Sequence, residues 1–118
     1  MVTGSVIVGD FSPIPVKELA RIDIDDFKRL TKAVHKYNSY IFVEIGHLGL
    51  YSTADIIYSP SVNKAFFKEN ANSVEITKED ILRFENYFIE AAIRAQKAGF
   101  DGIEICISFN FNFIIFIT

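Results

Sequence analysis

The sequence has one cysteine among its 118 residues and no apolar run of membrane-spanning length. A single cysteine, Cys106, excludes an intramolecular disulfide and a multi-cysteine zinc or iron–sulfur site built by this chain alone. No apolar run reaches the roughly 18 residues that cross a bilayer, and the start of the chain lacks the basic region and long apolar core of a signal peptide. We therefore expect a cytoplasmic protein with no membrane partner.

Positive charge is scarce as well. The chain has 12 Lys and Arg residues against 15 Asp and Glu residues, a net charge of -3 and a pI near 5.3. Proteins that bind nucleic acids present an excess of positive charge to the phosphates, so this balance argues against a nucleic acid partner. The length suits one modest soluble domain rather than two with separate cores.

A first amphipathic helix is expected over residues 23–38. Asp23 is the expected N-cap, and Asn38 is the expected stop. The apolar side chains that recur at helical spacing, and that should form the buried face, are Phe27, Leu30, Val34 and Tyr37.

A second helix is expected after Thr77 and carries the strongest signals in the sequence. Thr77 and Asp80 have the spacing of a capping box, and Gly99 follows the helix as the expected left-handed residue. Its expected buried face consists of Ile81, Phe84, Phe88, Ala91 and Ala95.

Short apolar segments indicate three strands. Residues 5–8 and 40–45 are two of them, and a third begins at Gly102. The second has no turn residue inside it, as in strands buried on both faces of a parallel sheet. Residues 46–73 are expected to form a long loop that covers a site or moves.

The alternation of strands and helices predicts an α/β fold with a parallel sheet and right-handed crossovers. Three strands cannot close a barrel of about eight. The sequence therefore predicts a partial TIM (β/α) barrel sector with about three parallel strands and two main helices. Strand parity places Glu44 and Glu104 on the face that turns away from the helices, while the aliphatic residues of the same strands pack beneath them.

Residues 74–105, VEITKEDILRFENYFIEAAIRAQKAGFDGIEI, resemble a segment of the old yellow enzyme family, the FMN-dependent NADH:flavin oxidoreductases and ene-reductases. The family segment leads into the fourth barrel strand. Upstream, FVEIGHLGLYS is similar to the family pattern Q-x-x-H-x-G-R, with Glu44, His47, Gly49 and Leu50 at the corresponding positions. The resemblance covers about residues 4–105.

This resemblance implies a TIM barrel that holds FMN at its mouth. The flavin takes hydride from NADH or NADPH and passes it to an electron-poor alkene or another small acceptor. The implied partners are therefore NAD(P)H and such an acceptor. Glu44 stands at the position of a flavin-contacting Gln, which makes it the one candidate cofactor-binding residue, and Leu50 replaces the family's Arg.

The catalytic positions implied by the resemblance are occupied by other residue types. The family continues H-G-A-H-G-Y or H-x-x-N-x-Y, and these groups fall on Cys106, Phe109 and Phe111. A thiol is a weak hydrogen-bond donor and a phenyl ring is none, so charge developing on a substrate oxygen would meet no strong donor. We therefore expect no catalytic residue and no metal site in this chain.

Several single residues have simpler interpretations than catalysis. Cys106 is expected to be a small buried hydrophobe, His47 a loop-stabilising residue and His35 a solvated side chain. The carboxylates of Glu44, Asp101 and Glu104 suggest an acid/base pair, but barrel geometry alone explains them.

The end of the chain departs from the family pattern. Residues 1–105 are interpreted as a partial FMN-oxidoreductase-like barrel and residues 106–118 as a divergent tail rich in Phe, Asn and Ile. A shifted reading frame or a truncated gene is our leading hypothesis for the tail, and its pattern favours an extended strand that pairs at a sheet edge. The alternative is a short added strand that covers such an edge.

The function expected from the sequence is that of a fragment of an FMN-dependent NAD(P)H:flavin oxidoreductase that is inactive alone. The alternative is a non-catalytic interaction module that associates with itself through an exposed barrel edge or complements another barrel fragment.

Overall fold

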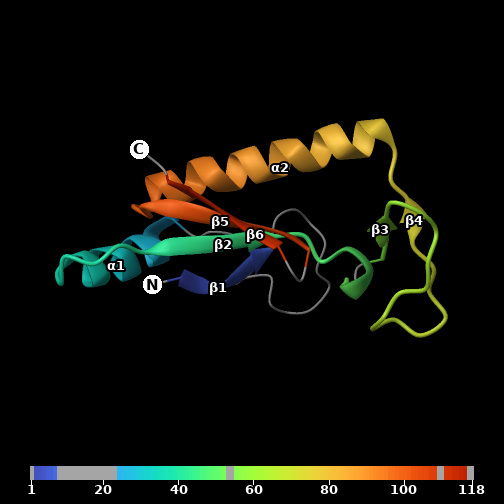
Figure 1. Ribbon diagram of the computed structural model, residues 1–118, viewed down its shortest axis with the longest axis horizontal. Coiled ribbons are helices and arrows are strands. Elements are labelled where there is room, and N and C mark those ends of the chain that lie inside the picture. Colours follow the sequence, from blue (N-terminus) through green and yellow to red (C-terminus); the bar gives the residue numbers. More distant parts are fainter. Residues whose placement is uncertain (1, 8–23, 53–54, 109–110, 117–118) are drawn as a thin grey trace.

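The protein forms a four-stranded sheet with two helices packed against the same apolar cluster (Figure 1). The computed structural model describes residues 2–7, 24–52, 55–108 and 111–116, with side chains described within 24–52 and 55–105. The strand order is β1-β2-β5-β6. The bounds of these strands are Val2–Ile7 for β1, Phe42–Gly46 for β2, Gly102–Ser108 for β5 and Phe111–Phe116 for β6.

The strand directions confirm the predicted α/β sector. β1 pairs with β2, and β2 pairs with β5, both in parallel. The first strand begins at Val2 rather than at Ser5. β6 pairs with β5 in antiparallel direction, so the tail contributes a strand at the edge of the sheet.

The first helix, α1, spans Ile24–His35, and the expected cap Asp23 lies outside the described residues. Asn38 has a φ of 53°, in the left-handed region, which confirms it as the stop. The expected buried face is wrong at two positions, since Leu30 is 36% exposed and Tyr37, beyond the helix end, is 83% exposed. Thr31 takes the inward position instead and is buried.

The second helix, α2, spans Lys78–Lys97 and begins with the predicted capping box. The backbone N–H of Asp80 donates to the Thr77 hydroxyl at 3.1 Å, and the backbone N–H of Thr77 donates to the Asp80 carboxylate at 3.0 Å. Hydrogen bonds from the backbone and the hydroxyl of Thr77 lower the pKa of Asp80. The prediction of a buried Ile81 is wrong: the first turn of α2 extends past the sheet, and Ile81 is 44% exposed (Figure 1).

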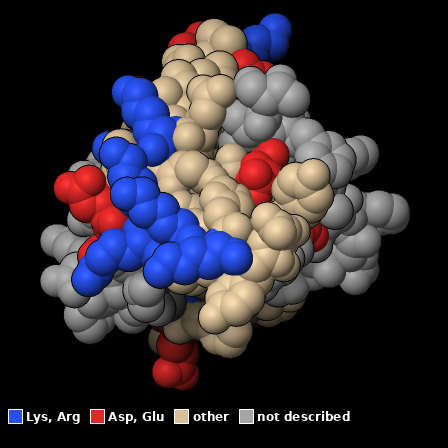
Figure 2. All heavy atoms as spheres, turned by 90° about the vertical axis from the view of Figure 1, so that its left-hand side faces the viewer, with Lys and Arg blue, Asp and Glu red and all other residues tan. Residues whose placement is uncertain are grey.

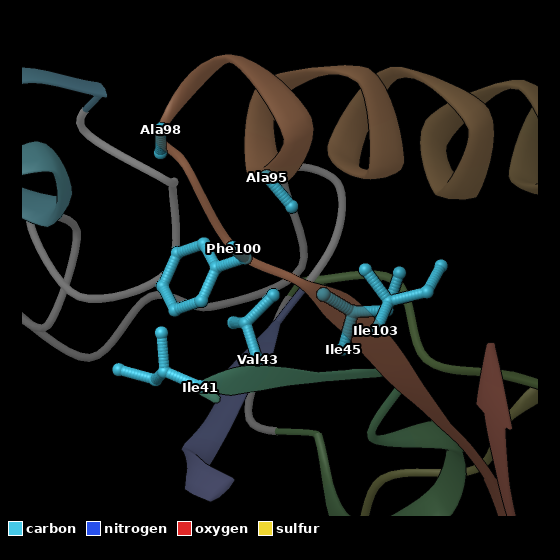
Figure 3. Close-up of a cluster of buried hydrophobic side chains, with 7 residues drawn as sticks. All are labelled: Ile41, Val43, Ile45, Ala95, Ala98, Phe100 and Ile103. Carbon is cyan, nitrogen blue, oxygen red and sulfur yellow. The ribbon is translucent and has the colours of Figure 1, made fainter. Parts of the chain in front are cut away.

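The core lies between β2, β5 and the last turns of α2 (Figure 3). Ile41, Val43 and Ile45 are fully buried, whereas Phe42 and Glu44 between them are half-buried on the other face. The alternation predicted from strand parity is confirmed, but burial of β2 on both faces is not. Each buried Val or Ile side chain stabilises the fold by about 1.5–3 kcal/mol. The remaining members of the core are Ala95, Ala98, Phe100 and Ile103.

A buried hydrogen bond joins the two helices. The Thr31 hydroxyl of α1 donates to the carbonyl oxygen of Ala98, just past α2, at 2.7 Å. The next residue, Gly99, has a φ of +88°, and a Cβ placed there would lie 3.0 Å from the Thr31 Oγ1 atom. Gly99 therefore provides both the left-handed turn and the close approach of α1.

Asp101 joins three elements at the amino ends of the strands. Its Oδ2 atom accepts from the Ile41 backbone N–H at 2.9 Å and lies 2.8 Å from His35 Nε2, while its own N–H donates to the Ile41 carbonyl at 3.0 Å. Burial acts to raise the pKa of Asp101, but the hydrogen bonds from His35 and Ile41 outweigh it, so the net pKa is lowered. The expectation of a solvated His35 is thus only partly correct.

Lys and Arg side chains form a band on the side of the molecule where α1 and the carboxyl end of α2 lie (Figure 2). The last turn of α1 carries Lys32, and the last turn of α2 carries Arg94 and Lys97. Cations at the carboxyl end of a helix face its partial negative charge, which stabilises the helix by about 0.3–1 kcal/mol each. These three cations therefore stabilise the ends of the two helices.

We predict that Gly99→Ala lowers the free energy of unfolding by about 1–3 kcal/mol, because an L-residue at a φ of +88° is strained and its Cβ crowds Thr31. Gly49→Ala is the matched control, since Gly49 also has a positive φ but an added Cβ there meets nothing within 4 Å. Urea unfolding of both variants measures the difference. Equal losses would mean that the contact with Thr31 contributes nothing.

The free energy of unfolding should fall at acid pH, because the Asp101 carboxylate becomes protonated there. A carboxyl group whose pKa is lowered on folding contributes stability above its unfolded pKa, and that contribution is lost as the pH falls from the unfolded value toward the folded one. We expect Asp101→Asn to remove this part of the pH dependence below about pH 4 and to cost about 1 kcal/mol at neutral pH. Urea unfolding at a series of pH values tests it, and an unchanged acid slope would contradict it.

Candidate functional site

The connection between β2 and α2 is more ordered than predicted. It contains a 3-10 helix, η1 (Gly49–Tyr51), and two short strands, β3 (Tyr58–Ser59) and β4 (Val74–Glu75), which pair in parallel. The predicted long loop over residues 46–73 is thus present, with η1 and β3 as the short regular elements within its described part. Contacts distant in sequence order the segment: the buried hydroxyls of Ser59 and Ser73 bond to each other, and Ile57 is 2% exposed.

This connection docks on the amino-terminal half of α2, beyond the carboxyl ends of β2 and β5 (Figure 1). The Tyr58 ring meets the Phe84 ring edge-on, with centroids 5.2 Å apart. Arg83 donates to the Tyr58 hydroxyl at 3.1 Å and to the Asp80 carboxylate at 2.7 Å. In parallel α/β sheets, ligand sites lie at the carboxyl ends of the strands, so this is the end where a site is expected.

His47 follows β2 directly and is held from two sides. Its Nδ1 atom accepts from the Gly49 backbone N–H at 3.0 Å, and its ring lies 5.0 Å from the Phe84 ring of α2. Burial lowers the pKa of His47, so the ring is neutral at physiological pH and its proton sits on the buried Nε2 atom. The predicted role of His47 in stabilising the loop is confirmed.

Glu44 and Glu104 lie side by side on the sheet. They are direct register partners on the parallel strands β2 and β5, which places their Cα atoms about 5 Å apart on one face of the sheet. Both side chains are half-buried. Carboxylate oxygens accept hydrogen bonds, so the pair concentrates acceptor atoms on this face. The arrangement suits a donor-rich or cationic group and opposes an anionic one.

The structure separates the other predicted positions. Asp101 lies at the amino ends of the strands with His35 and Ile41, so it forms no pair with Glu44 or Glu104. The backbone of Cys106 lies in β5 between Gly46 of β2 and Asn112 of β6. Phe111 begins β6 opposite Ser108, and Phe109 lies outside the described residues.

Sequence reasoning missed an aromatic group near the strand ends. The Tyr51 ring stacks on Phe66 at 4.5 Å and meets Phe67 at 5.6 Å. Phe66 and Phe67 remain 62% and 68% exposed. Only the adjacency of two Phe residues within a polar segment could have indicated it.

The described part of the chain has neither a metal-binding cluster nor a membrane-spanning helix. Among these residues there is no group of three or more His, Cys, Asp or Glu side chains that could hold a metal ion. Neither α1 nor α2, the helices described, is long and apolar enough to cross a bilayer.

His47 should make the free energy of unfolding depend on pH. Because its pKa is lowered on folding, the unfolded chain takes up a proton near pH 6.5 before the folded chain does, and the free energy of unfolding falls as the pH drops below that value. His47→Asn places an oxygen near the Nδ1 position and cannot titrate, so we expect this slope to disappear. Urea unfolding between pH 5 and pH 7 is the measurement, and a slope retained in the variant would contradict the assignment.

Solved structures share the arrangement of strands and helices. Histamine dehydrogenase from Rhizobium sp. 4-9 superposes with a TM-score of 0.76 at 20% sequence identity, over 89% of this chain and 18% of that chain. The old yellow enzyme homologue from Zymomonas mobilis gives a TM-score of 0.69 at 20% identity, over 88% and 34%. These similarities show that the fold is a sector of a TIM barrel.

Sequence similarity is more specific. The NADPH dehydrogenases of Bacillus subtilis and Bacillus licheniformis are 36% and 39% identical over 83 and 84 residues, 70% of this chain in each case. The NADH oxidase of Thermoanaerobacter brockii is 36% identical over 84 residues, 67% of this chain. The chain spans 24% of each NADPH dehydrogenase and 13% of the NADH oxidase.

A family model matches residues 19–114, a range that takes in residues 106–114 of the Phe- and Asn-rich tail as well as the barrel elements. The match, the relatives and the fold agree, and the resemblance to the old yellow enzymes is confirmed. The chain belongs to the NADH:flavin oxidoreductase / NADH oxidase family, whose members depend on FMN.

Proposed function

We propose that these 118 residues are a barrel segment of an FMN-dependent NAD(P)H oxidoreductase, and that the segment alone neither holds FMN tightly nor transfers hydride. The observation that carries the proposal is the register of Glu44 with Glu104, which puts two carboxylates side by side where the family has a flavin-contacting Gln. Reduced flavin is an anion, and it is stabilised by donors rather than by acceptors.

The residues at the carboxyl end of the described sheet do not fit FMN by themselves. Glu44 and Glu104 supply acceptors, and the His47 Nδ1 atom is occupied by the Gly49 N–H. In barrels of this class the phosphate is gripped by loops after the seventh and eighth strands. This chain covers about a quarter of its relatives' length. NADH or NADPH as donor and a small electron-poor acceptor are therefore proposed for the complete barrel only.

The sequence at the family's catalytic positions supports the same proposal. Cys106, Phe109 and Phe111 stand where the family places its two imidazole or amide donors and its tyrosine. A missing donor at a developing oxyanion lowers the rate by about two to three powers of ten. With the three groups replaced, these positions offer neither a strong donor to polarise an acceptor carbonyl nor a tyrosine to deliver a proton.

The purified protein tests the proposal by flavin titration. We expect no stoichiometric FMN complex at micromolar protein, from absorbance and fluorescence quenching, and no NADPH or NADH oxidation above that of free FMN. Glu44→Gln, which restores the family's residue and removes one of the two carboxylates, should strengthen any weak quenching of FMN fluorescence but should not give a stoichiometric complex, because the phosphate-gripping loops are still missing. A yellow one-to-one complex that oxidises NADPH would overturn the proposal.

A second function, a non-catalytic interaction module, is favoured by the apolar surface. Leu82, Ile89 and Ile93 lie along one line of α2 opposite its buried face and are 61%, 56% and 45% exposed. Colourless, concentration-dependent oligomers in analytical ultracentrifugation of the same sample would support association through such surfaces. A colourless monomer would support the first proposal alone.

A further inference from the structure

The strand β5 has neighbours of opposite direction on its two edges. On one edge β2 pairs with it in parallel, from Phe42 opposite Gly102 to Gly46 opposite Cys106. On the other edge β6 pairs with it in antiparallel direction, with partners that run from Gly102 to Ser108. Both edges of β5 are therefore occupied along the strand.

A complete (β/α) barrel requires a different partner on the second edge. Each strand of such a barrel lies between two parallel neighbours. Two parallel strands need a crossover of a dozen or more residues, whereas only residues 109–110 separate β5 from β6. β6 is thus a hairpin partner, and it uses the backbone groups that the next parallel strand would need. The two pairings exclude each other.

The sequence of the tail suits this role. Residues 105–118 contain no charged residue and no proline, the features that normally protect an edge strand. Closing a hairpin over two residues costs little entropy, and the short tether gives β6 a high effective concentration at the edge. A strand from another polypeptide must compete with β6 for the same edge, and β6 has the advantage of this high effective concentration.

We propose that β6 is an intramolecular cap on the edge of β5, and that the partner excluded by it is the next parallel strand of a complementary (β/α) barrel segment. The inference goes beyond the proposed function, because it concerns strand pairing and its tests need no flavin. The chain accepts the rest of a barrel only after β6 has left the edge.

A disulfide staple tests the cap in the full-length chain. In a Cys106→Ser background, cysteines are placed at the register pair Glu104 and Ile114, and in a second variant at Ile105 and Phe113. Consecutive antiparallel pairs alternate between wide and close spacing, so at least one variant has the close geometry that a disulfide requires. The control places cysteines at Glu104 and Asn112, which are displaced by two residues.

We expect mild oxidation to cross-link at least one register variant and to leave the control as thiols, measured by mass spectrometry under non-reducing conditions. Equal cross-linking in the control and the register variants, or none in any of them, would overturn the proposal that β6 caps the edge of β5. A monomeric cross-linked product confirms that the pairing is intramolecular. A cross-linked dimer would overturn it.

The second arm tests the excluded partner. The probe is the remainder of the Bacillus subtilis NADPH dehydrogenase barrel, produced separately and beginning after the region that this chain matches. It is mixed with the stapled chain in oxidised and reduced form, and with a chain that ends at Ser108. Gel filtration with light scattering detects a one-to-one complex.

We expect no capture by the oxidised staple, weak capture by the reduced chain, and capture on the order of a hundredfold tighter by the shortened chain. Equal capture by the oxidised and reduced forms would show that the β5 edge is not the docking surface. Absence of capture by the reduced form and by a shortened chain that circular dichroism shows to be folded would also overturn the proposal. Should the shortened chain not fold, the oxidised and reduced staples decide by themselves.

Discussion

Contact between the aliphatic face of β2 and the last turns of α2 is the interaction on which the rest of the structure depends. Ile41, Val43 and Ile45 are fully buried there, and the residues of α2 that meet them include the small Ala95. Small side chains let a helix approach a sheet closely, and close packing is what makes burial favourable. The same contact fixes the site, because side chains alternate along a strand and Glu44 must then face away from the helix.

The two ends of the sheet are secured differently. At the amino ends, Asp101 bonds to Ile41 and Thr31 bonds to Ala98, across 60 and 67 residues of sequence, and Gly99 allows the close approach. At the carboxyl ends, ring contacts join the hydrogen bonds, with His47 and Tyr58 packed on Phe84. In TIM barrels the amino ends serve stability and the carboxyl ends serve function.

Local signals made much of the fold predictable. Short sequence patterns predicted the capping box at Thr77 and the left-handed residues Asn38 and Gly99. They also predicted the parallel strands β2 and β5. Partners distant in sequence were not predictable, because periodicity within a segment does not encode what it meets. The pairing of β3 with β4 and the inward position of Thr31 are examples.

For the candidate site, the sequence placed Glu44 and Glu104 on the same face of the sheet but did not give their register. The side-by-side placement of Glu44 and Glu104 depends on the register of two strands separated by a helix and a long connection, and a slip of one residue would have separated them. The neutral state of His47 likewise depends on burial by α2. The resemblance to the family predicted which residues occupy the catalytic positions. The structure was needed to show which groups surround Glu44 and His47.

The lengths of α2 and β5 differ in a way that shapes the molecule. A helix of 20 residues is about 30 Å long, whereas a strand of seven residues is about 23 Å long, so roughly one helical turn projects beyond the sheet. The turn that follows the projecting one carries Arg83 and Phe84, which Tyr58 of the β3–β4 pair contacts. The amino-terminal part of α2 therefore supports the β3–β4 pair. Because Tyr58 contacts both Arg83 and Phe84, the β3–β4 pair is held against the amino-terminal part of α2, beyond the carboxyl ends of β2 and β5.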